Sequence, residues 1–173
     1  MSDDARRTAA DPDPSDAPHE IDVEPIPEQV VVCLGGRGPI AELRERGRRV
    51  AAVLAAAGVA PAGPLMARYP QTDYDPADLE FEVGLPIAPR PDGSVPDRVG
   101  DLPVVLIPAH HAMVARHRGP LTGLAAAHRA IAAALDDVGY RRAGPVSEVY
   151  LAGPEQGLPP SEYLTEVRYP DAR

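Results

Sequence analysis

The chain has 173 residues, of which 44% are apolar, and this suits one folded domain with a hydrophobic core. A formal net charge of −9 argues against a nucleic-acid surface, because such surfaces carry clustered positive charge. The single cysteine, Cys33, cannot form an internal disulfide, and the scattered histidines offer no set of zinc ligands. We therefore expect no cofactor, no metal and no direct nucleic-acid partner.

Residues 1–19 are small, polar and rich in Asp and Pro, without an apolar period. This composition predicts a disordered acidic tail, followed by one folded domain over residues 20–173. The chain has no apolar stretch long enough to span a membrane as a helix, and no apolar segment typical of a signal peptide. These features predict that the protein lies in the cytoplasm and does not contact a membrane.

The first ordered segments follow one another as strand, helix, strand, strand. The apolar run 30–34 predicts a strand, and Gly38-Pro39 then opens a helix that Gly58 is placed to end. Residues 64–69 and 79–87 predict two further strands, joined by a turn rich in Asp and Pro.

The same series then runs a second time. Arg37-Gly38-Pro39 recurs as Arg118-Gly119-Pro120, and Ala62-Gly63-Pro64 recurs in the same register as Ala143-Gly144-Pro145. The second series predicts a strand at 112–116, a helix at 121–138 and strands at 146–151 and 163–169. We interpret this as an internal duplication, with copies at about 21–87 and 102–171.

Two copies are too few for a solenoid, so each must close its core against the other. The expected fold is α+β: duplicated strand–helix–strand–strand units with pseudo-twofold symmetry, forming an antiparallel sheet. We expect both helices on one face of the sheet, which leaves the opposite face open as a concave ligand groove.

The strand at 146–151 carries the main candidate residues. Glu148 and Tyr150 share one face because side chains alternate along a strand. The first copy has Ala67 at the position of Glu148 and Tyr69 at the position of Tyr150, so the groove is expected to be asymmetric at its centre. We predict that a carboxylate among tyrosine rings binds a cationic or aromatic ligand through charge and cation–π attraction.

Glu82 and Glu166 occupy corresponding positions in the two copies and are further candidates for ligand binding. The plainer interpretation, for these two and for Glu148, is that a half-exposed sheet turns polar side chains to water without any function. A metal role for His110-His111 is disfavoured because adjacent strand residues point to opposite faces, and His117 and His128 have no convincing ligand partners in the sequence.

Several motifs resemble the GyrI-like small-molecule-binding domains, which are similar to the effector-binding domains of BmrR-type and Rob-type transcription regulators. These motifs are the Arg-Gly-Pro opening of each helix, the Ala-Gly-Pro turn, and the segments DPADLEFEVGLPI, SEVYL and YLTEVRYP. The resemblance covers residues 21–171. The resemblance implies the duplicated fold and a groove for hydrophobic, often cationic compounds, with Glu148 at its floor and Tyr150, Tyr69 and Glu166 lining it. We expect the chain to differ from those regulators in lacking a DNA-binding domain, since only about 20 residues precede the motifs.

Three functions are therefore open. The first is a stand-alone binder that sequesters or senses a hydrophobic, cationic or aromatic small molecule. The second, less favoured, is a hydrolase of electrophilic, cyclopropane-type natural products, in which Glu148 with a raised pKa acts as general acid and base with help from Tyr150. The third is a protein-interaction role, such as the gyrase modulation for which the family is named.

Overall fold

The computed structural model describes residues 19–70, 75, 77–139 and 141–172. The expected tail at 1–19 therefore lies, apart from His19, outside the described residues. The helical elements are η2 (Ile40–Glu42), α1 (Leu43–Ala56), η3 (Leu121–Gly123), α2 (Leu124–Val138), η4 (Pro154–Gln156) and η5 (Pro160–Glu162). The strands are β1 (Ile21–Ile26), β2 (Gln29–Gly38), β3 (Met66–Tyr69), β4 (Leu79–Ile87), β5 (Arg98–Val99), β6 (Leu102–Ile107), β7 (His110–Arg118), β8 (Arg141–Arg142), β9 (Val146–Ala152) and β10 (Leu164–Ala172).

These elements follow one order twice. The series β2, α1, β3, β4 is matched by β7, α2, β9, β10, and Gly58 and Gly139 end the two helices in the left-handed region, at φ 67° and 69°. The strand order in the sheet is β1-β7-β10-β9-β3-β4-β2-β6-β5, with β8 beside β10, and every described pair is antiparallel. The two halves meet where β9 pairs with β3. The predicted α+β fold class is confirmed.

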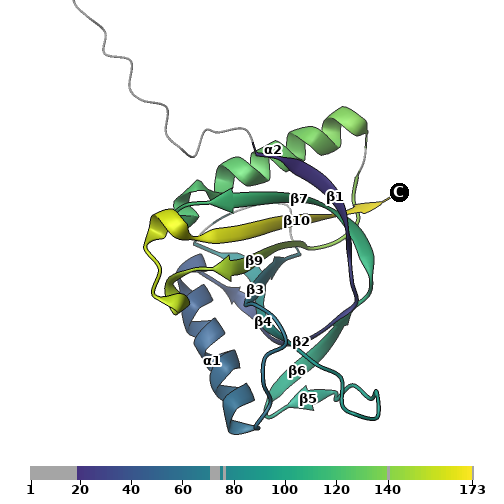
Figure 1. The fold of residues 1–173 in the computed structure, drawn as a ribbon, viewed down its shortest axis with the longest axis vertical. Helices are drawn as coiled ribbons and strands as arrows, with labels where there is room; N and C mark the ends of the chain where they lie inside the picture. Colours follow the sequence, from purple (N-terminus) through teal and green to yellow (C-terminus); the bar gives the residue numbers. More distant parts are fainter. Residues whose placement is uncertain (1–18, 71–74, 76, 140, 173) are drawn as a thin grey trace, which may run out of the picture.

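The two helices pack on the same face of the sheet, over different halves (Figure 1). Val50 and Leu54 of α1 pack against a cluster that includes Val32 of β2, while Ile131 and Leu135 of α2 pack against residues from β7, β9 and β10. Burial of these apolar side chains holds each helix in place. Within the described ranges, neither helix is long and apolar enough to cross a lipid bilayer.

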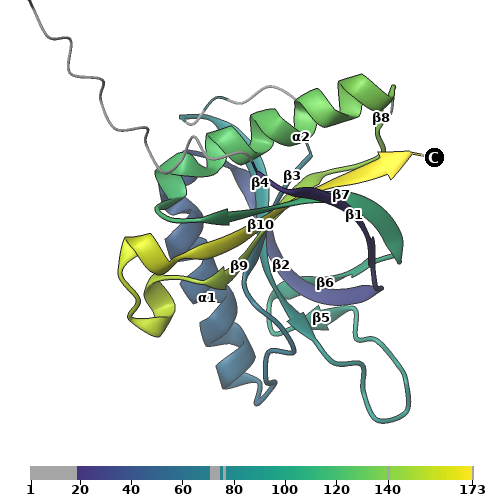
Figure 2. The ribbon, with the colours of Figure 1, turned by 45° about the horizontal axis from the view of Figure 1, so that its top comes forward.

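The opposite face of the sheet is filled rather than open. The sheet bends strongly, so that the outer strands β1 and β6 come round toward that face (Figure 2). Val31, Cys33, Met66, Ile107 and Val149 form a buried cluster there, drawn from four strands. The expectation of a ligand groove on the face away from the helices was therefore wrong: curvature of the sheet lets this face bury its own side chains.

The sequence missed four strands, β1, β5, β6 and β8. Both β1 and β6 extend the sheet, since β1 pairs with β7 and β6 pairs with β2. The two-residue strands β5 and β8 pair with β6 and β10, so each half gains two strands beyond the repeated unit. The longer additions, β1 and β6, supply the bent ends of the sheet. The predicted strands and helices otherwise agree with the observed elements to within a few residues at their ends.

Candidate functional site

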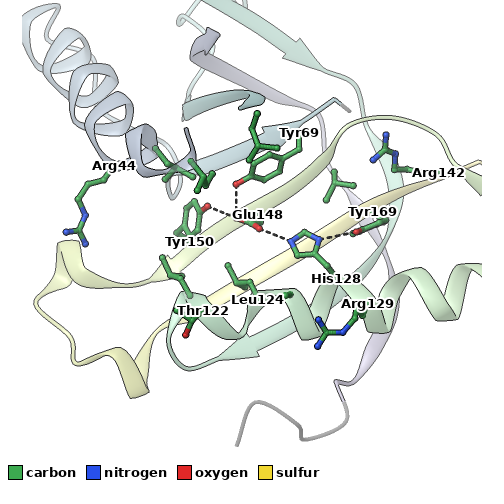
Figure 3. A pocket seen from close by; sticks show the side chains of 16 residues that line it. Arg44, Tyr69, Thr122, Leu124, His128, Arg129, Arg142, Glu148, Tyr150 and Tyr169 are labelled. Carbon is green, nitrogen blue, oxygen red and sulfur yellow. Dashed lines mark hydrogen bonds and ion pairs between the residues drawn. The ribbon is translucent and has the colours of Figure 1, made fainter. Parts of the chain in front are cut away.

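A cavity of about 720 Å³ lies between the two helices, above the central strands β3 and β9 (Figure 3). Leu43 from α1 and Leu124 from α2 contribute apolar walls on the two sides, and Tyr69, Glu148 and Tyr150 lie at the floor. The cavity exists because each helix covers its own half of the sheet, which leaves the strands at the junction uncovered. This groove is on the helix-bearing face.

Strand register explains how Glu148 reaches this face. Glu148 pairs with Ala67 of β3 on one side and with Val167 of β10 on the other. Residues at such paired positions share a face of the sheet. The same row continues outward on both sides through apolar residues: Leu34, Val83, Ala67, Glu148, Val167, Ala115 and Ile21. Glu148 is the one charged side chain in this row of described residues, and it is opposite Ala67.

Three polar side chains contact the Glu148 carboxylate, and a fourth supports one of them. The hydroxyls of Tyr69 and Tyr150 donate hydrogen bonds to Oε2, at 3.0 and 2.6 Å. His128 of α2 places its Nε2 2.7 Å from Oε1, and its Nδ1 lies 3.0 Å from the Tyr169 hydroxyl. An ionised carboxylate only accepts, so Nε2 carries the proton in this contact. The carboxylate is thereby held in one orientation by groups from both halves of the molecule.

These contacts set the charge state of the floor. Burial by itself would raise the pKa of Glu148, but the hydrogen bond and charge of His128, with the hydroxyls of Tyr150 and Tyr69, outweigh burial and lower the pKa below its ordinary value. Burial and the neighbouring carboxylate raise the pKa of Tyr150 far above its ordinary value. The floor therefore holds an ionised carboxylate beside a tyrosine that keeps its proton. The raised pKa expected for Glu148 from the sequence was wrong, because desolvation is offset by this donor set.

The structure does not bring the other two predicted acids into the cavity. Glu82 lies on the opposite face, where its carboxylate contacts Arg68 at 2.9 Å. Glu166 also lies on that face and is paired with Arg168 at 2.5 Å and Arg116 at 3.2 Å. Both side chains alternate with apolar neighbours that face the helices, so their own strands turn them away from Glu148. Their negative charge is already matched by arginine.

Two residues of the floor, His128 and Tyr169, were missed by sequence reasoning. A signal for His128 was present, since it lies four residues after Leu124 and three before Ile131, both of which are buried. That spacing places its side chain on the face of α2 that packs on the sheet. Tyr169 lies two residues after Val167 on β10 and so shares its face.

Arginines lie at the rim of the cavity. Three arginines contribute to its lining: Arg44 of α1, Arg129 of α2 and Arg142 of β8 (Figure 3). Arg142 also donates to the carbonyl of Pro70 at 3.1 Å. An approaching ligand thus meets positive charge at the rim and negative charge at the floor.

The described part of the chain contains no group of three or more His, Cys, Asp or Glu side chains that could hold a metal ion. Cys33 is buried in the apolar cluster of the opposite face, and burial raises the pKa of its thiol to about 12. At neutral pH the thiol is protonated, which makes it a poor metal ligand.

Comparison with known proteins places this fold. A family model for the GyrI-like small molecule binding domain matches residues 19–170. The structure is similar to the EcmrR C-terminal domain, with a TM-score of 0.80 and 19% identity over 90% of this chain and 98% of that domain. In the cryo-EM structure of the EcmrR–DNA complex, the matched region spans 58% of the EcmrR chain. A search of curated proteins gave no match.

Two further structures are similar at lower scores. One is a hydrolase encoded by lin2189 from Listeria innocua, with a TM-score of 0.64 and 15% identity over 90% of this chain and 94% of that one. The other is SAV2435 bound to tetraphenylphosphonium, with a TM-score of 0.61 and 13% identity over 88% of this chain and 94% of that one. At these identities the likeness establishes the fold.

Proposed function

The chain belongs to the GyrI-like small-molecule-binding domain family, and we propose that its groove binds apolar, aromatic molecules that carry a delocalised positive charge. The observation that carries this proposal is the Glu148 carboxylate, which is 8% exposed and stays ionised at the floor of an apolar-walled cavity. Attraction between such a carboxylate and a cation strengthens as water is excluded. Binding of this kind suits sequestration or sensing of the ligand.

The tyrosines support the same ligand class. Tyr69 and Tyr150 flank the carboxylate, and both of their hydroxyls point at it. Their rings are therefore fixed, and a ring face near a cation contributes about 0.5–2 kcal/mol. Flat walls of this kind accept many molecular shapes, so we expect a permissive site.

The rim arginines narrow the ligand class further. Arg44 and Arg129 are exposed at the mouth, so a small hydrated cation meets repulsion before it reaches Glu148. A cation whose charge is covered by aromatic rings loses little hydration on entry and presents apolar surface to the rim. Lipophilic cations should therefore bind better than hydrophilic ones of equal charge.

Isothermal titration calorimetry with tetraphenylphosphonium tests the proposal, a probe suggested by the complex of the similar protein SAV2435. We expect saturable binding to the wild type and a loss of at least about tenfold in Glu148→Gln, equivalent to about 1.4 kcal/mol. The matched control is Glu82→Gln, the same change on the opposite face, which should leave the affinity unchanged. Tetramethylammonium, which has the charge without the rings, should bind far more weakly. Equal affinity in the wild type and Glu148→Gln would refute the role of Glu148.

A second candidate function is hydrolysis of an electrophilic, cyclopropane-type compound. The observation in its favour is the 2.6 Å contact between the Tyr150 hydroxyl and Glu148, whose pKa values are pushed in opposite directions. In this scheme Glu148 accepts a proton from the attacking water as the C–O bond forms, and Tyr150 donates its proton to the carbon released when the ring C–C bond breaks. The proton on Glu148 then passes back to Tyr150 along their 2.6 Å contact, which restores both groups. Mass spectrometry of such a compound incubated with the wild type should then show addition of one water. Tyr150→Phe should still bind the compound but form no product; binding without product in the wild type would reject this candidate.

A further inference from the structure

A second cavity, of about 430 Å³, adjoins the groove on the side of α1. It is bounded by α1 and by the segment that contains η4. Four residues, Tyr150, Leu43, Arg44 and Leu121, line both cavities, so the two cavities adjoin at these side chains. Arg44 also approaches Glu155 of η4, at 3.9 Å, where α1 and this segment come together.

The second cavity occupies, in the first half of the chain, the place that the first cavity occupies in the second half. The sequence offset that aligns the two Arg-Gly-Pro triplets also aligns β3 with β9. A slightly larger offset, which aligns Glu82 with Glu166, aligns β4 with β10. Hydrogen bonds repeat in these registers: Ala62 N donates to Pro86 O at 2.7 Å, and Ala143 N donates to Pro170 O at 2.9 Å. Positions related in this way can therefore be compared directly.

The comparison shows that the polar floor has no counterpart in the first half. Gly47 corresponds to His128, and Leu85 corresponds to Tyr169; both Gly47 and Leu85 line the second cavity. Ala67, which is fully buried, corresponds to Glu148. His128, Tyr169 and Glu148 of the first floor are thus each replaced by hydrogen or a hydrocarbon, whereas Tyr150 and Tyr69 correspond to each other.

We propose that the second cavity binds an uncharged alkyl or aryl extension of the same ligand whose charged part lies over Glu148. This inference rests on the proposed function of the first cavity. The charged and amide side chains of its lining, Arg44, Arg48, Glu155 and Gln156, are exposed and so belong to its opening. Deeper in the cavity, beside Gly47 and Leu85, a polar ligand group would lose its hydration without gaining a side-chain partner, whereas an apolar group would not. The chemical class is an amphiphilic cation with one elongated apolar arm that passes Tyr150.

The test is a series of methyl-, butyl- and hexyl-triphenylphosphonium ions titrated by calorimetry. In the wild type the affinity should rise with chain length, by about fourfold for each methylene that becomes fully buried. Ala51→Phe changes an exposed alanine of α1 that lines the second cavity and not the first. It should leave methyl-triphenylphosphonium binding unchanged and remove the gain with chain length.

Ala125→Phe is the matched control, because Ala125 is an exposed alanine of α2 that lines the first cavity and not the second. It should weaken all three ions by a similar factor. Ala152→Leu narrows the second cavity from β9 and serves as an independent variant if Ala51→Phe does not fold. Two results overturn this inference alone. In the first, the wild type binds the methyl ion but its affinity does not rise with chain length. In the second, the affinity still rises with chain length in the variants of the second cavity. Failure of the methyl ion to bind the wild type overturns the proposed function, and this inference with it.

Discussion

The two halves of the molecule are alike in how they pack and unlike in what their floors carry. Leu54 in α1 and Leu135 in α2 are corresponding, buried residues that hold their helices on the sheet. At the junction, by contrast, Ala67 of the first half faces Glu148 of the second. This difference shows that one packing arrangement can carry a charged floor in one half and an apolar floor in the other. The substitutions that distinguish them lie on the strands and helix faces between α1 and α2.

The largest expected effect tests the likeness in packing. Leu54→Ala and Leu135→Ala each remove a buried side chain and leave a cavity, so each should lower the free energy of unfolding by about 2–5 kcal/mol. Urea unfolding followed by circular dichroism measures both. If the halves pack alike, the two losses should be similar; a half that tolerates its substitution without loss would show that its helix is not held by this contact.

The next effect concerns the charged floor, which only the second half has. The pKa of Glu148 is below its ordinary value of 4.5, so the folded protein favours the ionised form. Its contribution to stability is fully present above about pH 4.5 and is lost as the pH falls through the lower pKa of the folded state. The wild type should therefore lose more unfolding free energy than Glu148→Gln between about pH 5 and pH 3. Urea unfolding at several pH values in this range measures this difference. If the unfolding free energies of the wild type and Glu148→Gln fell in parallel with pH, the fold would not stabilise the ionised carboxylate.

The smallest expected effect concerns Tyr169, which corresponds to Leu85 in the other half. Tyr169→Phe keeps the ring and removes the hydroxyl that contacts His128. The lost hydrogen bond should lower the free energy of unfolding by about 0.5–1.5 kcal/mol. Tetraphenylphosphonium binding should change by less than about threefold, because His128 retains its contact with Glu148. A loss of affinity as large as that of Glu148→Gln would mean that Tyr169 itself contacts the ligand.

Much of the fold could be predicted from the sequence because the repeated Arg-Gly-Pro and Ala-Gly-Pro triplets mark the same turns in both halves. The helices and the six repeated strands followed from apolar spacing between those turns. The outer strands β1 and β6 lie outside the repeated unit, so the repeat gave no signal for them. The bend that these strands supply is a property of the whole sheet, and local patterns do not encode it.

The site was predicted in part, and strand register explains the limit. Alternation shows which side chains of one strand share a face, and it correctly grouped Glu148 with Tyr150. It does not show which face of one strand adjoins which face of the next; that depends on pairing, here of Ala67 with Glu148 and of Glu148 with Val167. Glu82 was therefore placed with Glu148, although its strand turns it to the other face.

The central claim is that the ligand lies over Glu148, between the helices. A crystal structure of the protein in complex with tetraphenylphosphonium tests it most directly. We predict the phosphonium centre above the Glu148 carboxylate, with its rings against Tyr69 and Tyr150. A phosphonium bound on the opposite face, beside Glu82 or Glu166, would contradict the claim.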